Sequence, residues 1–275
     1  MNKIGILQGR LTPSSKGELQ CFPTNAWKTE LRAAADIGFD SIEWILNSES
    51  RIENPFWSHQ GRQNVLEASQ RSSVEISSIC VDLIMEDEFW GNESDPGQFL
   101  AQQVKQILEG AKELECRRLV FPLLDRASLS KKENLPLFSS IFSQLAESFS
   151  DANITCLIEV DIPAEELLNF LKEIPHVKIC YDLGNVITFG YDSVAEIKVL
   201  SEQIEEIHIK DRTVKDGSVL LGEGETVFSK SFDQLFSFDY QGPFVIEAPR
   251  GESPIETGKK HFAFVTNLIK ERIQP

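Results

Sequence analysis

The sequence predicts an α/β barrel in which eight parallel strands close into a cylinder inside a ring of helices. Short apolar segments alternate with longer segments of helical periodicity, and eight such units follow one another. The apolar segments are hydrophobic almost throughout, as strands buried on both faces are. An open, doubly wound sheet is the alternative, but eight consecutive units in about 250 residues fit a closed barrel better.

Each element has its own local signal. The expected strands are 3–7, 41–45, 75–81, 117–124, 154–159, 177–182, 204–210 and 244–247. Apolar residues recur every three or four positions in 26–38, 99–114, 135–149, 164–174 and 193–204, which are expected helices.

Capping signals mark the ends of several helices. Capping-box spacing predicts three helix starts, at Ser130 with Glu133, Ser193 with Glu196, and Ser253 with Glu256. Pro254 suits a first helical position, and Gly38 suits a helix end.

Composition narrows the class of protein. No linker or low-complexity stretch divides the 275 residues, so residues 1–275 are expected to form one catalytic domain. The formal charge of -16 disfavours a nucleic-acid or anionic-membrane partner. Five cysteines without CxxC spacing indicate neither a disulfide framework nor a thiolate zinc site. The amino-terminal apolar stretch 4–7 is too short for a secretory signal, so a cytoplasmic protein is expected.

Polar residues close four successive expected strands. Glu159, Asp182 and Glu247 lie at strand ends, and His208 lies near one. Because the carboxyl ends of barrel strands meet at one mouth, these side chains are expected to converge there. Three carboxylates and an imidazole would repel or crowd one another unless a cation lies between them. The pattern therefore predicts one bound divalent metal ion, with Mn²⁺, Mg²⁺, Co²⁺ and Zn²⁺ all suited to the donors.

The other three histidines are weaker candidates as ligands. His176 precedes a strand and His261 lies in the last helical segment, so structural or surface roles are expected. His59 lies in a segment that reads as an aromatic-rich loop after the second strand and could overhang the site. Gly222 and Gly224 lack the strand-to-helix context of a phosphate-binding loop.

Several sequence stretches together resemble one known family. They are LIE at 157–159, YDLGN at 181–185, HIKDR at 208–212, LGEGETVF at 221–228 and FVIEAPR at 244–250, with GILQGRLTP and ISSICVDLIMED earlier in the chain. The chain is similar to the sugar phosphate isomerases and epimerases with a xylose isomerase-like TIM barrel, a group distantly related to endonuclease IV. The resemblance places that family's metal ligands at Glu159, Asp182, His208 and Glu247, and makes Mn²⁺ the expected ion.

The resemblance also implies a reaction. In the family's 3-epimerases a metal chelates adjacent ketose oxygens, and a proton leaves carbon three to give an enediolate. Two glutamates serve as acid and base, and Glu159 and Glu247 would fill these catalytic roles in either order. If both were only ligands, hydrolysis or dehydration would be expected instead.

Candidate substrate-binding residues surround this predicted site. Free-ketose 3-epimerases of the family tend to carry a histidine where this chain has Asn185, a form more like that of the pentulose-phosphate 3-epimerases. Lys210, Arg212 and Arg250, with Arg10, could bind a phosphate or neutralise carboxylates.

Residues at the ends of the second to fourth strands could complete the rim. Glu43, Asp82 and Asp125 are candidate hydroxyl ligands, and Trp44 is a candidate sugar platform. Phe89 and Trp90 suit a lid, a hydrophobic plug or a subunit contact.

Three functions remain open at this point. The leading one is a metal-dependent isomerase or epimerase of a small ketose or ketose phosphate, with a homo-oligomer as a compatible assembly. The second is an inosose-type dehydratase on the same barrel. The third is an endonuclease IV-like phosphodiesterase, which four histidines and a strongly acidic chain disfavour.

Overall fold

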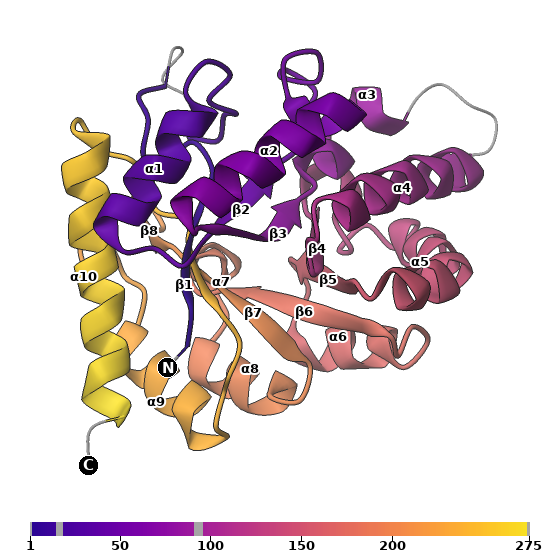
Figure 1. The fold of residues 1–275 in the computed structure, drawn as a ribbon. Helices are drawn as coiled ribbons and strands as arrows, with labels where there is room; N and C mark the ends of the chain where they lie inside the picture. Colours follow the sequence, from indigo (N-terminus) through magenta and orange to yellow (C-terminus); the bar gives the residue numbers. More distant parts are fainter. Residues whose placement is uncertain (1, 15–18, 91–95, 274–275) are drawn as a thin grey trace.

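The computed structural model of the protein describes residues 2–14, 19–90 and 96–273 and has a closed barrel at its centre (Figure 1). The barrel strands are β1 (Ile4–Leu7), β2 (Ser41–Ile45), β3 (Glu75–Cys80), β4 (Arg118–Leu123), β5 (Thr155–Val160), β6 (Val177–Asp182), β7 (Ile204–Ile209) and β10 (Phe244–Ile246). They are parallel and close in the order β1-β10-β7-β6-β5-β4-β3-β2. This confirms the predicted barrel and rules out the open sheet.

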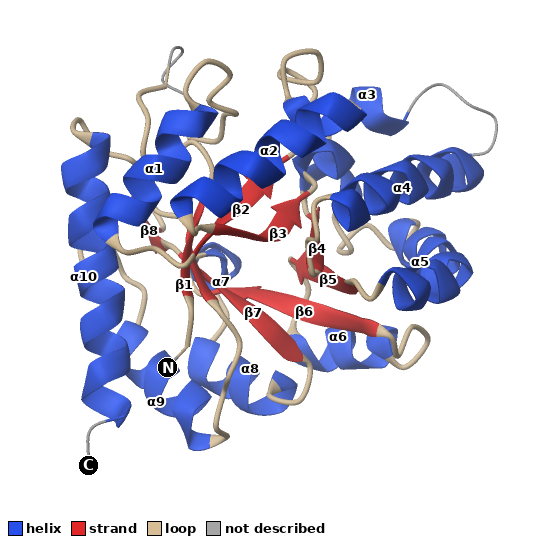
Figure 2. Ribbon diagram, viewed as in Figure 1, coloured by secondary structure: helices blue, strands red, loops and turns tan. Residues whose placement is uncertain are grey.

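Helices surround the strands, as Figure 2 shows. The longer ones are α1 (Trp27–Ile37), α2 (His59–Ser72), α4 (Pro96–Glu113), α5 (Asn134–Ala152), α6 (Ala164–Leu171), α8 (Ser193–Leu200), α9 (Phe228–Ser237) and α10 (Pro254–Ile273). Short turns are α3 (Asp87–Trp90), α7 (Asn185–Phe189), η1 (Pro55–Trp57), η2 (Asp82–Met85) and η3 (Asp125–Ala127). A two-stranded hairpin of β8 (Asp211–Thr213) and β9 (Gly217–Val219) follows β7 and was not predicted.

The capping predictions are partly correct. Helix α10 begins at Pro254, and Gly38 ends α1 in the left-handed conformation. The Ser193 prediction is wrong, because the Asp192 carboxylate one residue earlier accepts the first free amide hydrogens of α8.

The Ser130 prediction is wrong as well. Helix α5 begins later, at Asn134, and the preceding Glu133 makes no side-chain cap. The Ser130 hydroxyl lies 2.6 Å from that of Ser128 and is used within the loop.

The strand pleat decides which side chains enter the barrel. Successive residues point to opposite faces of a strand, so every second residue faces the interior. Five interior residues form a small apolar cluster of their own, separate from the main core: Leu7, Cys80, Val120, Leu157 and Cys180. The same alternation places Glu206 and His208 of β7 on one face, and Lys210, directly after the strand, continues that face.

One aromatic prediction is corrected by this geometry. Trp44 is fully buried outside the barrel, where it packs against Phe22 and Trp27 and donates its indole N–H to Asn54. It is therefore a core residue and does not form a sugar platform.

Phe89 and Trp90 act as a plug. Both are buried, and the Trp90 indole donates to the Ile84 carbonyl and packs edge-on against Phe138. Of the three roles considered for this pair, hydrophobic packing is the one that these contacts match.

Candidate active site

The four predicted ligands converge at the mouth of the barrel. One donor atom from each of Glu159, Asp182, His208 and Glu247 lies within 4.8 Å of the other three. His208 Nδ1 lies 3.1 Å from Glu247 Oε2 and 3.5 Å from Glu159 Oε2. All four residues are buried. The geometric prediction made from the strand ends is thus confirmed.

Lys210 compensates part of this negative charge. Its Nζ lies 2.9 Å from Asp182 Oδ2 and 2.8 Å from Glu247 Oε1, and Arg10 Nη2 lies 3.8 Å from the same glutamate oxygen. Burial by itself would raise the pKa of Glu247, but Lys210 and His208 hold that pKa well below its usual range. For Asp182 burial prevails over the attraction of Lys210 and raises the pKa to about 6.

The DLGN turn after β6 organises one side of the site. Asp182 Oδ1 accepts the backbone N–H groups of Gly184 and Asn185, at 2.7 and 2.9 Å. Glycine is required at position 184 because a Cβ there would lie 2.7 Å from the Lys210 carbonyl oxygen. The turn thereby fixes Asp182 and presents the Asn185 side chain to the barrel mouth.

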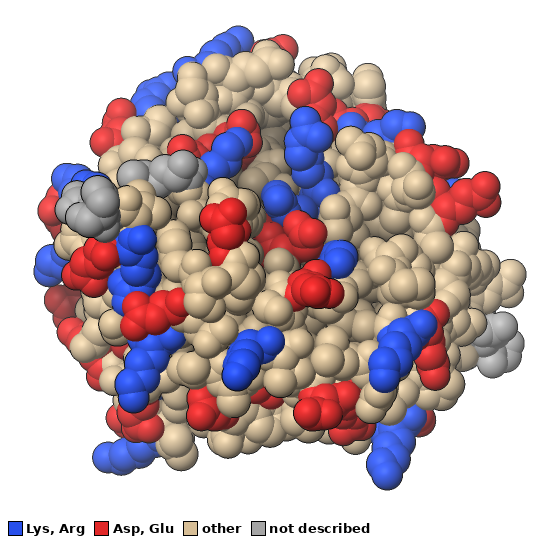
Figure 3. Space-filling model, turned by 90° about the horizontal axis from the view of Figure 1, so that it is seen from below, with Lys and Arg blue, Asp and Glu red and all other residues tan. Residues whose placement is uncertain are grey.

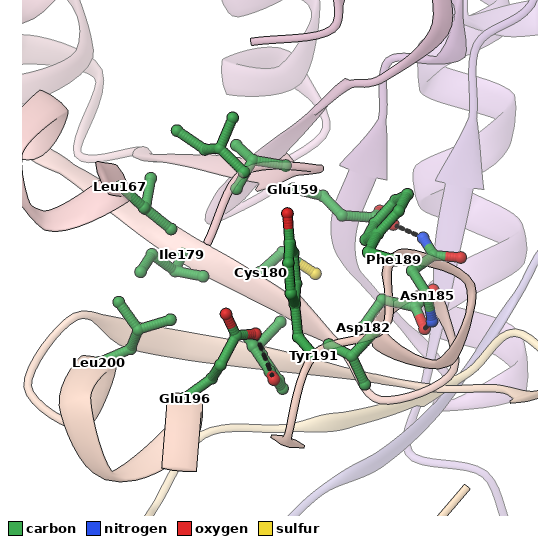
Figure 4. A pocket seen from close by; sticks show the side chains of 14 residues that line it. Glu159, Leu167, Ile179, Cys180, Asp182, Asn185, Phe189, Tyr191, Glu196 and Leu200 are labelled. Carbon is green, nitrogen blue, oxygen red and sulfur yellow. Dashed lines mark hydrogen bonds between the residues drawn. The ribbon is translucent and has the colours of Figure 1, made fainter. Parts of the chain in front are cut away.

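Asn185 links an arginine to a glutamate. Its amide donates to Glu159 Oε1, a contact drawn dashed in Figure 4, and its carbonyl accepts from Arg212 Nη1 at 2.7 Å. Both residues were predicted to bind substrate, which remains a prediction. In this structure they form a chain of contacts that ends on Glu159.

A small cavity lies behind these residues. In Figure 4 Glu159, Asp182 and Asn185 lie at one end of the cavity, while Leu167, Ile179 and Leu200 form an apolar end. The Glu196 carboxylate on α8 accepts the Tyr181 hydroxyl at 3.0 Å and the Ala164 amide at 3.0 Å.

Three further candidates lie elsewhere than expected. Arg250 donates to the carbonyls of Gly9 and Leu19, each at 2.8 Å, and so braces the loop after β1. Asp125 is exposed at the start of η3 and is not part of the cluster. Glu43 is fully buried behind His208, with Oε1 3.0 Å from His208 Nε2, and so faces the imidazole nitrogen that points away from the four-residue cluster.

The remaining peripheral candidates make contacts within the protein. Asp82 is buried and accepts from Gln20 Nε2 at 2.8 Å. His59 begins α2 instead of lying in a loop, and it pairs with Glu113 on the outside of the barrel. Gly222 and Gly224 donate their amides to Asp211, in agreement with the absence of a phosphate-binding loop.

One buried residue, Glu206, was missed. It lies on β7 two residues before His208, with Oε1 3.7 Å from His208 Nε2. The spacing of two along a strand was a signal that could have found it, because such residues share a face.

The residues present fit a divalent cation. The cluster offers three carboxylates and one imidazole nitrogen, and His208 Nδ1 is buried without a hydrogen bond among the described residues. Such oxygen-rich sites with one histidine suit Mn²⁺, Mg²⁺, Co²⁺ or Zn²⁺.

Charged side chains of both signs are distributed over the face drawn in Figure 3. Acidic and basic side chains are intermixed there, and no continuous basic stripe crosses the view. Among the described residues, no helix has both the length and the apolar character needed to cross a membrane.

Fold and site together define a TIM-barrel enzyme whose polar residues meet at the carboxyl ends of the strands. Residues 31–266 match the xylose isomerase-like TIM barrel family, and the chain belongs to it. L-Ribulose-5-phosphate 3-epimerase UlaE of Salmonella paratyphi A is 24% identical over 237 residues, covering 80% of this chain and 81% of that protein. This protein is an enzyme of the isomerase class.

Solved structures agree with the fold. A structure of L-ribulose 3-epimerase has a TM-score of 0.76 at 16% identity, covering 99% of this chain and 96% of that one. The IOLI protein with a binding zinc atom has a TM-score of 0.76 at 14% identity, covering 99% and 100%.

Proposed function

We propose that the protein is a divalent-metal-dependent 3-epimerase of a ketose or ketose phosphate. The observation that carries this proposal is the placement of Glu159 and Glu247 together beside His208 Nδ1, in one buried cluster with Asp182. The name of the UlaE relative, an L-ribulose-5-phosphate 3-epimerase, supports a pentulose phosphate as the first substrate to test.

Glu159, Asp182, His208 and Glu247 would hold the ion. When bound, a divalent cation supplies Lewis-acid polarisation of the substrate carbonyl, which makes the neighbouring C–H bond acidic. Mn²⁺ is the ion proposed, because oxygen donors with a single imidazole match its preferences.

The two glutamates would carry the proton. One carboxylate removes the proton from carbon three, and the other delivers a proton to the opposite face of the resulting enediolate, which inverts that centre. Lys210 and His208 keep Glu247 ionised, the form that accepts a proton. The order of the two roles follows from which epimer is bound.

Asn185 and Lys210 would position these groups. Asn185 holds one oxygen of Glu159, so that the other oxygen faces His208. Lys210 holds Asp182 and Glu247 together by its two contacts.

Hydrogen exchange tests the proposal directly. Manganese-loaded protein is incubated in heavy water with L-ribulose 5-phosphate and with a panel of free ketoses, and deuterium is located by NMR. Deuterium at carbon three with formation of the epimer is expected, and Glu159→Gln and Glu247→Gln should each abolish it. Glu196→Gln, which removes a carboxylate with no contact to the four ligands, is the matched control.

The same experiment separates the alternatives. Deuterium at carbon one would show aldose–ketose isomerisation, and loss of water from a polyol ketone would show a dehydratase. Either result, or exchange that persists in both glutamine variants, would contradict the proposal.

A further inference from the structure

A buried polar group lies beneath His208, on the side away from the four-residue cluster. It consists of Glu43 on β2 and Glu206 on β7, and both side chains are 0% exposed. His208 Nε2 lies 3.0 Å from Glu43 Oε1 and 3.7 Å from Glu206 Oε1, while Nδ1 faces Glu159 and Glu247. The imidazole thus has one carboxylate pair on each side.

This polar group lies where apolar side chains would serve stability better. The interior residues around it include Leu7, Val120 and Leu157, which form an apolar cluster. Four oxygens of Glu43 and Glu206, and His208 Nε2 which they face, are buried without a hydrogen bond among the described residues. Buried carboxylates are costly unless paired, so these two are best explained by what they do for their neighbour.

Arg118 supplies a counter-charge from the opposite end of the barrel. Its Nε lies 3.9 Å from Glu206 Oε2, and its side chain is 23% exposed. A row of charged groups therefore extends from Arg118 through Glu206 and Glu43 to His208. It ends at His208 Nε2, the ring nitrogen that faces away from the four-residue cluster.

We propose that Glu43 and Glu206 are positioning residues: their carboxylates face His208 Nε2 at 3.0 and 3.7 Å, favour a proton on that nitrogen and thereby direct Nδ1 into the site. Histidine ligands in metal sites generally donate their second ring N–H to a carboxylate, which fixes the ring and its tautomer. The expected effect on metal affinity rests on the proposed function, whereas the orientation of the His208 ring is independent of it.

A second cation site is the competing explanation. Donor atoms of Cys180, Glu206 and His208 also lie within 4.8 Å of one another. Arg118 already provides positive charge beside Glu206, and His208 Nε2 is closest to Glu43. These contacts favour positioning over a second ion.

The first test uses metal-free protein and NMR. In the wild type, a downfield His208 Nε2 proton that exchanges slowly with solvent is expected, and its absence in His208→Asn assigns it. Glu43→Gln should lose or shift this resonance strongly, and Glu206→Gln should shift it less. Glu196→Gln should leave it unchanged. An unaltered resonance in Glu43→Gln would overturn the inference.

The second test is a Mn²⁺ titration of the same variants. Glu43→Gln should bind Mn²⁺ about 10- to 100-fold more weakly, the usual effect of losing such a partner. If the melting temperature of Glu43→Gln is close to that of Glu196→Gln, loss of folding is not the cause of weaker binding. If Glu43→Gln does not fold, Glu206→Gln takes its place in the titration.

The outcomes distinguish the two proposals. Unchanged Mn²⁺ affinity in both variants, or two ions per chain with one lost in Glu206→Gln, would overturn the positioning role while leaving the main site intact. If the wild type binds no Mn²⁺, the proposed function fails. The NMR resonance of the His208 Nε2 proton then still tests the inference about the orientation of the ring.

Discussion

Asn185→Ala is the substitution whose effect can be worked out most fully. The change removes the amide that donates to Glu159 Oε1 and the carbonyl that accepts from Arg212. It leaves the Asp182 contacts in place, because those use the backbone N–H groups of residues 184 and 185. The variant should therefore keep the turn that fixes Asp182 and lose control of Glu159, which is both a proposed ligand and a proposed catalytic carboxylate.

The size of the effect follows from the type of hydrogen bond. A hydrogen bond to a charged group contributes about 1.5–3 kcal/mol, and about 1.36 kcal/mol corresponds to a tenfold change in rate. If this contribution is realised in the transition state, kcat should fall about 10- to 150-fold in Asn185→Ala.

The assay is the steady-state rate of epimerisation, with Mn²⁺ affinity measured in parallel. Since Arg212 reaches Glu159 only through Asn185 in these contacts, Arg212→Ala added to Asn185→Ala should cost little more. Wild-type kcat in Asn185→Ala would refute the positioning of Glu159. Fully additive losses in the double variant would refute the chain of contacts.

Three other predictions test separate parts of the molecule. Burial raises the pKa of the Glu30 carboxyl from 4.5 to about 7, so between these two pH values the folded state binds more protons than the unfolded state. The free energy of unfolding should therefore fall as pH rises from about 5 to 7, by up to about 3 kcal/mol. Urea denaturation of Glu30→Gln should show no such pH dependence, and an equal pH dependence in this variant would disprove the role of Glu30. Trp90→Ala should lower the free energy of unfolding by about 3–5 kcal/mol if the ring is a plug, whereas a loss of kcat without destabilisation would indicate a lid. Glu247→Gln should reduce turnover at least a hundredfold, about the effect of losing a general acid or base, with little change in melting temperature; comparable losses of both would make the residue architectural.

The sequence was informative about the strands and the main cluster for one physical reason. Strands buried on both faces leave continuous apolar segments, and a closed parallel barrel brings all their carboxyl ends to one mouth. Polar residues ending such strands must then approach one another, as Glu159, Asp182 and Glu247 do.

The height of a residue along the barrel axis was not predictable in this way. Glu43 and His208 both point inward, but Glu43 lies behind the imidazole because of how the strands are staggered. Strand register depends on packing around the whole barrel, which local sequence does not encode. The outward direction of Trp44, by contrast, was available from sequence, since it follows the inward-facing Glu43.

For the basic residues the sequence left two roles open, phosphate binding and neutralisation of carboxylates. Lys210, Arg212 and Arg250 follow strand ends, where either a phosphate or a neighbouring polar group could hold them. In the structure each contacts the protein itself, through Asp182, Asn185 and the Gly9 carbonyl respectively. Sequence gives no measure of how many carboxylates and carbonyls compete for each cation.

Calorimetric titration of metal-free protein with Mn²⁺ tests the central claim most directly. We predict one ion per chain in the wild type and in Glu196→Gln, and a loss of at least tenfold in affinity for Asp182→Asn and for His208→Asn. Binding of the same strength in all four proteins, or no binding in the wild type, would contradict the account.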